Sequence, residues 1–129
     1  MKIGELAALS GATTKTIRFY EQVGVLPEPE RTAGGYRDYG PESVDRLRFV
    51  RCAQEAGLPL REVRQILAVH DRGEAPCGHV RDLLGERLDR IRAQIAELVA
   101  LETRVVSLLD RKPDEHDTTA VCWILETDE

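Results

Sequence analysis

The stretch Thr13–Tyr39, TTKTIRFYEQVGVLPEPERTAGGYRDY, decides the fold of the first half of the chain. Thr13 is a residue type that caps helix N-termini, and Gly24 stands where glycine commonly ends a helix, so a short helix is predicted between them. The stretch Pro27–Gly40 is rich in proline, glycine and charge, and Gly34-Gly35 allows a tight turn at its tip. A short helix followed by a loop with two short strands is therefore expected.

Further helices are predicted on both sides of this stretch. An amphipathic pattern from Ile3 to Leu9 is broken by Ser10-Gly11-Ala12, so that a helix, a turn and a second helix follow one another, as in a helix-turn-helix. A second pair follows, with one helix after Pro41 and another from about Leu60 to near Gly73. The apolar positions expected to face inward in this pair are Val44, Leu47, Phe49, Val50, Val63, Ile66 and Leu67.

One long helix is predicted from about Cys77 to Leu109. Its apolar residues recur in alternating steps of four and three, interrupted only at Glu102, and this is the repeat of a coiled coil. Because a helix of this length beside a small head cannot bury such a stripe alone, the pattern predicts a dimer. The stripe consists of Leu84, Leu88, Ile91, Ile95, Leu98, Val105 and Leu109.

The chain has 129 residues and a net charge of −5, but the charge is unevenly divided. Residues 1–51 carry 8 Lys and Arg against 7 Asp and Glu, whereas residues 77–129 carry 7 against 12. Because the negative charge is concentrated in the second half, the first half can still bind DNA if its basic side chains share one face. Because no apolar run suits a membrane span or a signal peptide, we expect a cytoplasmic protein with no membrane partner and with reduced cysteines.

The predicted helix after Thr13 has the side chains that a DNA major groove requires. Hydroxyl and basic groups stand at its leading end, and Arg18 follows one turn later on the same face. Arginines and a tyrosine on the loop are expected to grip the flanking backbone, whereas Ile17 and Phe19 are expected in the core. Tyr20 and Tyr36 can also be read as packing residues. The candidate DNA contacts are Thr13, Thr14, Lys15, Arg18, Tyr20, Arg31, Tyr36 and Arg37.

The 3 cysteines have different settings in the sequence. Cys52 is predicted to be a small buried residue of a helix. Cys77 starts the long helix, where the helix N-terminus favours the thiolate that metals bind. Cys122 lies in the tail, with His116 before it across a loop, and thiolate with imidazole suits zinc or a neighbouring soft divalent metal.

These pieces, in this order, resemble the MerR family of transcription regulators over nearly the whole chain. The most specific segments are Thr16–Glu21 (TIRFYE), Gly24–Pro27 (GVLP), Arg31 with Gly35-Tyr36-Arg37, and Arg46-Leu47. The resemblance implies a mainly α fold with a winged helix-turn-helix DNA-binding domain (1–72), an antiparallel coiled-coil dimerisation helix (73–110) and a C-terminal metal-binding loop and tail (111–129). It also implies a homodimer, and a protein that is not an enzyme.

The resemblance further implies a mechanism. The target is a promoter whose two recognition elements are spaced too far apart, and the activated dimer distorts this DNA so that RNA polymerase can engage. A drug-binding member of the family would need a large C-terminal domain, and an iron–sulfur member would need four closely spaced cysteines. A zinc enzyme would need a placed general base. The sequence offers none of these, so a metal-responsive regulator is the favoured interpretation.

The metal-sensing branch of the family places one cysteine at the start of the dimerisation helix and two in a C-terminal loop. Cys77 and Cys122 match the first and last of these, and His116 is the soft ligand between them. In the family's dimer the first cysteine of one protomer meets the loop of the other, so the resemblance implies that each ion bridges two chains. Two cysteines with a histidine favour Zn(II), with Cd(II) and Pb(II) as alternatives, whereas Hg(II) is expected to prefer thiolates throughout and Cu(I) sensors lack the first cysteine. Further candidate ligands are His79, Asp114 and Asp117.

Overall fold

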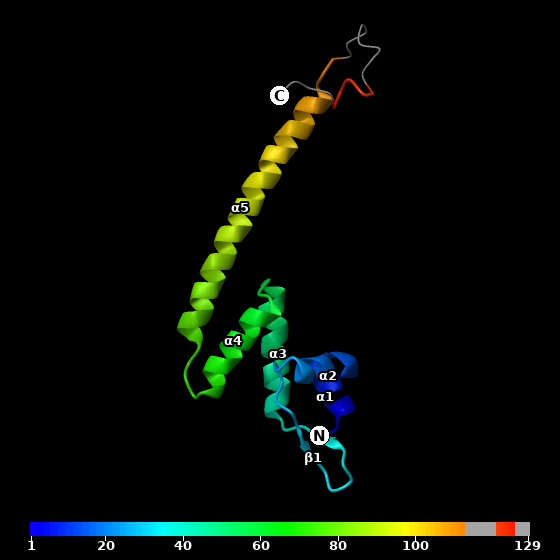
Figure 1. The fold of residues 1–129 in the computed structure, drawn as a ribbon, viewed down its shortest axis with the longest axis vertical. Helices are drawn as coiled ribbons and strands as arrows, with labels where there is room; N and C mark the ends of the chain where they lie inside the picture. The colour runs from blue at the N-terminus through cyan, green and yellow to red at the C-terminus, as the bar shows by residue number, and fades with distance from the viewer. Residues whose placement is uncertain (113–120, 126–129) are drawn as a thin grey trace. The chain divides into compact units, whose positions relative to one another are not determined.

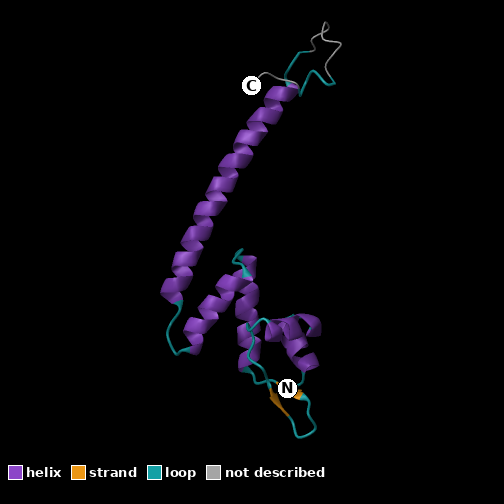
Figure 2. Ribbon diagram, viewed as in Figure 1, coloured by secondary structure: helices purple, strands orange, loops and turns teal. Residues whose placement is uncertain are grey.

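The computed structural model describes residues 1–112 and 121–125. The chain divides into two compact units, Met1–Arg87 and Leu88–Glu129, which are considered separately. Within the described residues there are five helices and a two-stranded sheet (Figures 1 and 2). None of these helices is both long enough and apolar enough to cross a bilayer.

The first two helices form the predicted helix-turn-helix. Helix α1 spans Ile3–Ser10 and α2 spans Thr14–Gln22. Thr13 caps α2, since its hydroxyl oxygen accepts a hydrogen bond of 3.1 Å from the backbone N–H of Thr16. Gly24 follows the end of α2 at a φ of 79°, a left-handed conformation that costs glycine little. The predicted cap and the predicted stop are both confirmed.

The loop after α2 forms the predicted pair of short strands. Strands β1 (Glu30–Arg31) and β2 (Arg37–Asp38) pair antiparallel, with Arg31 opposite Arg37. The backbone N–H of Thr32 donates to the carbonyl of Tyr36 at 2.8 Å, and Gly35 turns the chain at a φ of 82°. This hairpin is the wing of the head.

Helices α3 (Glu42–Glu55) and α4 (Leu60–Asp71) complete the head around two apolar clusters. One cluster joins α1, α2, the wing and the start of α3, and the other joins α3, α4 and the first turns of the long helix. The first contains Leu6, Ile17, Leu26, Tyr39, Val44 and Leu47. The second contains Val25, Val50, Ala53, Leu58, Val63, Ile66, Leu67 and Leu83.

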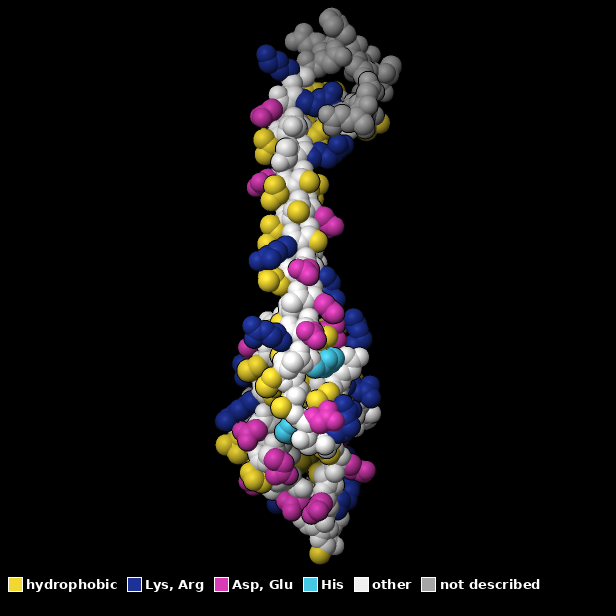
Figure 3. All heavy atoms as spheres, turned by 90° about the vertical axis from the view of Figure 1, so that its left-hand side faces the viewer, with side chains coloured by type: hydrophobic (Ala, Val, Ile, Leu, Met, Phe, Trp, Pro, Cys, Tyr) yellow, Lys and Arg dark blue, Asp and Glu magenta, His cyan; other side chains and the backbone are white. Residues whose placement is uncertain are grey.

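The long helix α5 spans Cys77–Leu109, as predicted. Its first turns belong to the unit Met1–Arg87, because Leu83 is buried in the second cluster and Val80 packs against it. Beyond them the apolar residues are exposed in the single chain, and Figure 3 shows apolar side chains recurring along this helix. The exposed set includes Leu88, Ile95, Leu98, Leu101, Val105 and Leu109.

Two predicted core residues are exposed. The Phe19 side chain is 47% exposed, because it lies two residues from buried Ile17 and therefore on the far side of α2. Cys52 is exposed for the same reason, since its helix buries Val50 and Ala53 on the face that Cys52 turns away from. The predictions of a buried Phe19 and a buried Cys52 were wrong.

Candidate DNA-binding surface and effector cysteines

The exposed face of α2 carries hydroxyl and basic side chains. Thr13, Thr14, Lys15 and Arg18 are all exposed, whereas Ile17 in the same segment is fully buried. The helix N-terminus adds the positive end of the helix dipole beside the two threonines. These four predicted residues therefore lie together on one accessible surface that suits an anionic backbone.

The wing presents two of its predicted residues and anchors the third. Tyr36 is 71% exposed at the hairpin tip. Arg31 is exposed, and its Nη1 donates to the carbonyl of Gly35 at 2.9 Å, which braces the tip. Arg37 is half-buried, and its Nε donates to a carboxylate oxygen of Glu21 at 3.2 Å.

The Glu21 carboxylate also accepts a hydrogen bond from the hydroxyl of Tyr39. Burial of Tyr39 and its hydrogen bond to Glu21 raise the pKa of this tyrosine to about 12, so the hydroxyl keeps its proton. Sequence reasoning missed Glu21 and Tyr39. The alternation of a strand places Tyr39 on the same side as Arg37, and that pattern could have indicated the group.

Tyr20 packs in the head. Its ring touches both apolar clusters, and its hydroxyl donates to the side-chain oxygen of Gln54 at 3.0 Å. Its ring centroid lies 6.0 Å from that of Phe19. The structure thus gives Tyr20 a packing role and a local hydrogen bond.

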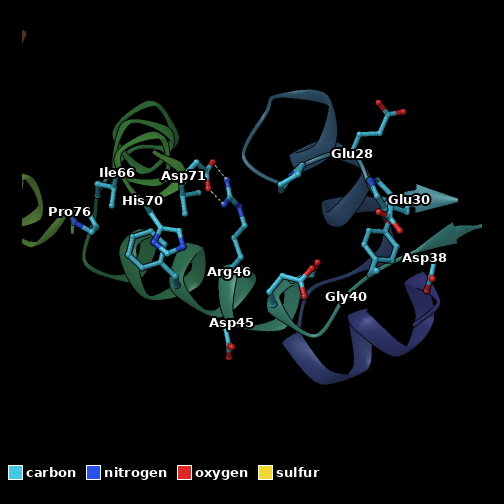
Figure 4. Close-up of a pocket in the computed structure, with 17 residues that line it drawn as sticks. Glu28, Glu30, Asp38, Gly40, Asp45, Arg46, Ile66, His70, Asp71 and Pro76 are labelled. Carbon is cyan, nitrogen blue, oxygen red and sulfur yellow. Dashed lines mark hydrogen bonds and ion pairs between the residues drawn. The ribbon is translucent and has the colours of Figure 1, made fainter. Parts of the chain in front are cut away.

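Arg46 ties α3 to α4 and to the turn after α2. Its Nε donates to the carbonyl of Val25 at 2.8 Å, and its two Nη atoms contact the Asp71 carboxylate at 2.7 and 3.0 Å (Figure 4). The hydrogen bond from Arg46 and the charge of its guanidinium hold the pKa of Asp71 below its usual range. Arg46 belongs to a segment that resembles the family, but no role was predicted for it. In the structure it links α3 to α4 and to the turn after α2.

A groove of about 870 Å³ lies beside this ion pair. Its lining is rich in carboxylates, including Glu28, Glu30, Asp38 and Asp45, which Figure 4 labels. Such a surface repels phosphate, so it contrasts with the exposed face of α2. The acidic groove and the exposed face of α2 are therefore two surfaces of opposite character on the head.

The cysteines and their candidate partners are only partly described. Cys77 is exposed at the first residue of α5, and Cys122 is half-buried in the short segment 121–125. His116, Asp114 and Asp117 lie outside the described residues. Within the described residues, no three Cys, His, Asp or Glu side chains gather as a metal site would need.

His79 is half-buried near the start of α5, and its Nε2 has no hydrogen-bond partner among the described residues. It lies two residues from Cys77 on the same helix. Helical geometry therefore turns the two side chains to different sides.

A capped helix-turn-helix with an exposed basic face, followed by a two-stranded wing, defines a winged helix-turn-helix DNA-binding protein. Two protein-family models that match the chain identify which family of DNA-binding proteins this is. Residues 1–69 match the MerR HTH family regulatory protein, and residues 44–108 match the model described as MerR, DNA binding. The chain belongs to the MerR family of transcription regulators, which are not enzymes.

Its relatives include regulators named for different metals. It is 41% identical to the mercuric resistance operon regulatory protein of Bacillus cereus, over 98% of this chain and 95% of that protein. It is 33% identical to the transcriptional regulator ZntR of Escherichia coli K12, over 97% of this chain and 89% of the relative. The solved structure of PbrR691 from Ralstonia metallidurans CH34 in complex with lead(II) matches with a TM-score of 0.76 and 37% identity, covering 89% of this chain and 93% of that one.

Proposed function

We propose that this protein is a metal-responsive transcription regulator that binds promoter DNA as a homodimer and activates transcription by distorting the DNA when a divalent metal binds. The observation that carries the proposal is the exposed surface at the start of α2, where Thr13, Thr14, Lys15 and Arg18 are all accessible while Ile17 is buried. That face would enter the major groove, with the wing against the flanking backbone. RNA polymerase is then a partner through the DNA.

The wing contacts in this proposal come from Arg31, Tyr36 and Arg37. Arg31 and Tyr36 are exposed at the tip, and Arg37 keeps about a third of its side chain accessible beside Glu21. Arginine suits phosphate because its planar guanidinium offers paired donors. Tyr20, whose hydroxyl is bonded within the head, is the weakest of the proposed contacts.

The dimer in this proposal forms through α5. The exposed stripe that includes Leu88, Ile95 and Leu98 runs along one long helix, and its coiled-coil spacing is what a partner helix would bury. We therefore assign DNA binding to residues 1–72, dimerisation to 73–110 and metal binding to 111–129, with Cys77 contributed by the dimerisation helix. We place the protein in the cytoplasm, where these thiols stay reduced.

The donor set fits a soft or borderline divalent metal. Cys77 is accessible at the start of α5, where the helix dipole favours a thiolate, and Cys122 offers a second thiolate in the tail. We propose His116 as the third ligand, with His79, Asp114 and Asp117 as alternatives. The ion, when bound, supplies a link that thiolates of two chains share, so it favours whichever dimer state brings them together.

We propose Zn(II) as the effector, because two thiolates and an imidazole form a ligand set that zinc favours. One relative is named for mercuric resistance, another is ZntR, and PbrR691 is solved with lead(II), so Hg(II) and Pb(II) compete with Zn(II) as effectors. Cd(II) is a further candidate, because it is a soft divalent metal that thiolates bind. A regulator of the same fold that answers a non-metal signal is the remaining alternative.

A metal titration of the reduced full-length protein tests the effector. Zn(II), Cd(II), Pb(II), Hg(II) and Cu(I) compete for the protein, and affinity and stoichiometry are measured for Cys77→Ser, Cys122→Ser and His116→Ala. Cys52→Ser is the matched control, because Cys52 is also an exposed thiol but lies on α3. We expect the first three variants to lose affinity and the control to keep it. Unchanged binding in all four variants would refute the proposed ligand set, whereas failure of the unsubstituted protein to bind any of the metals would refute metal sensing.

A further inference from the structure

The Glu21 carboxylate joins the end of α2 to the wing. Its side chain is only 10% exposed, and both of its oxygens accept hydrogen bonds. One bond comes from Nε of Arg37 and the other from the hydroxyl of Tyr39. A single acidic group therefore holds Arg37 of β2, and Tyr39 just after that strand, against the helix that carries Lys15 and Arg18.

One side of this group is fixed by the core. Tyr39 is 3% exposed and packs in the apolar cluster with Leu6 and Ile17. Its hydroxyl remains protonated because its pKa is raised to about 12, so it donates to Glu21 at any physiological pH. The carboxylate is thus held by a side chain that cannot easily move.

The other side of the group sets the direction of Arg37. The guanidinium is planar and rigid, so a hydrogen bond at Nε determines where the terminal Nη groups point. Neither Nη atom donates to another residue in the part of the chain that the structure describes. The side chain remains 32% exposed, which leaves those donors available to a ligand.

We propose that Glu21 is a positioning residue for DNA binding, which holds Arg37 through Nε so that its Nη groups bind a backbone phosphate beside the site of α2. The inference rests on the proposed function, because it takes the wing to contact DNA. It assigns a role in DNA binding to an acidic residue, which would otherwise be expected to repel the DNA backbone.

The sign of a mutational effect separates this role from simple electrostatics. Glu21 is an anion beside the surface that would meet an anionic backbone, so charge repulsion alone predicts tighter binding when it is removed. Positioning predicts weaker binding, because a released Arg37 must lose conformational entropy to reach the phosphate. The two explanations therefore predict opposite changes in affinity.

The experiment measures the affinity of the full-length protein for a DNA duplex selected from a random pool, over a range of salt concentrations. The variants are Glu21→Ala, Glu21→Gln, Arg37→Ala and the double variant of Glu21→Ala with Arg37→Ala. Glu28→Ala is the matched control for charge, since Glu28 is an exposed carboxylate lining the acidic groove. Thermal unfolding of each variant reports whether the head is folded.

We expect Glu21→Ala to weaken DNA binding about five- to tenfold. The slope of log affinity against log salt concentration should fall in magnitude by about 0.9 in Arg37→Ala, for one lost phosphate contact, and the slope of Glu21→Ala should move towards that of Arg37→Ala. Glu21→Gln keeps one acceptor oxygen and should lose less. The double variant should bind no more weakly than Arg37→Ala, because Glu21 acts through Arg37. Glu28→Ala should keep the salt slope of the unsubstituted protein.

Two kinds of result overturn the proposal and can be told apart. If Arg37→Ala weakens binding but Glu21→Ala binds equally well or more tightly, the positioning role is refuted while the wing contact stands. The positioning role is also refuted if Glu21→Ala costs as much affinity in the Arg37→Ala background, since a structural effect on the head would not depend on Arg37. If Arg37→Ala itself leaves affinity and salt slope unchanged, the proposed wing contact fails as well.

Discussion

Replacing Arg46 should be among the most destabilising single changes of an arginine in the head. Its Nε is the hydrogen-bond donor to the carbonyl of Val25, a residue that is fully buried. No other described residue donates to that carbonyl. Leaving a buried carbonyl unpaired costs about 1–3 kcal/mol. Losing the ion pair with Asp71, which is 50% exposed, adds at most about 1 kcal/mol after solvent screening.

Arg46→Ala should therefore lower the free energy of unfolding by about 1–4 kcal/mol, and Asp71→Ala by about 1 kcal/mol or less. Urea unfolding followed by far-ultraviolet circular dichroism measures both, at one fixed protein concentration so that association is held constant. The difference between the two variants isolates the bond to the Val25 carbonyl. Equal losses, or a loss below about 1 kcal/mol for Arg46→Ala, would refute the reasoning.

The pH dependence checks the smaller contribution. Hydrogen bonding to Arg46 lowers the pKa of Asp71 in the folded protein, so the unfolded state takes up a proton first as the pH falls. The stabilisation by Asp71 is then fully present above its unfolded pKa of about 3.9 and is lost as the pH falls through the lower, folded value. The stability difference between the unsubstituted protein and Asp71→Asn should accordingly shrink in strong acid and stay constant near neutrality.

Three further predictions concern DNA binding, packing and assembly. Arg18→Ala should weaken binding to every duplex alike and lower the salt slope by about 0.9, and an unchanged slope would exclude a phosphate contact. Gly57→Ala and Gly73→Ala should lower the melting temperature by similar amounts. Both glycines have φ near +80° (88° and 80°), and although a Cβ at Gly57 would lie 2.5 Å from Nε of Arg87, that atom is at the flexible end of a side chain that can move, whereas a Cβ at Gly73 meets nothing within 4 Å. A much larger shift for Gly57→Ala would show that Arg87 cannot move away. Ile95→Asp, on the exposed stripe of α5, should shift the protein towards the monomer in sedimentation experiments, and an unaltered dimer would place the interface elsewhere.

Local signals predicted the helices well. Three signals act over a few residues or repeat regularly, so the sequence contains them directly: the hydroxyl of Thr13, the left-handed Gly24, and the apolar repeat along the helix Cys77–Leu109. The predictions that were wrong concern which side of a helix faces the core. Phe19 and Cys52 are apolar, but each lies two residues from a buried neighbour and so points away from the core.

Long-range pairings were the part that the sequence did not reveal. Glu21 meets Arg37 and Tyr39, and Arg46 meets Asp71, across 16 to 25 residues of chain. Such contacts depend on how helices pack rather than on a local pattern. The basic face of α2 could be predicted because all its members belong to one short helix.

The exposed stripe of α5 also bears on how the amount of this protein in a cell would matter. If two chains must associate before DNA can be bound, the concentration of the active dimer depends on the square of the monomer concentration. When most of the protein is monomeric, doubling its concentration therefore raises the dimer concentration about fourfold. Occupancy of a promoter would then rise more steeply than the protein level itself. A modest increase in expression would be amplified before any effector arrives, and the dose of the regulator would become a control variable beside its signal.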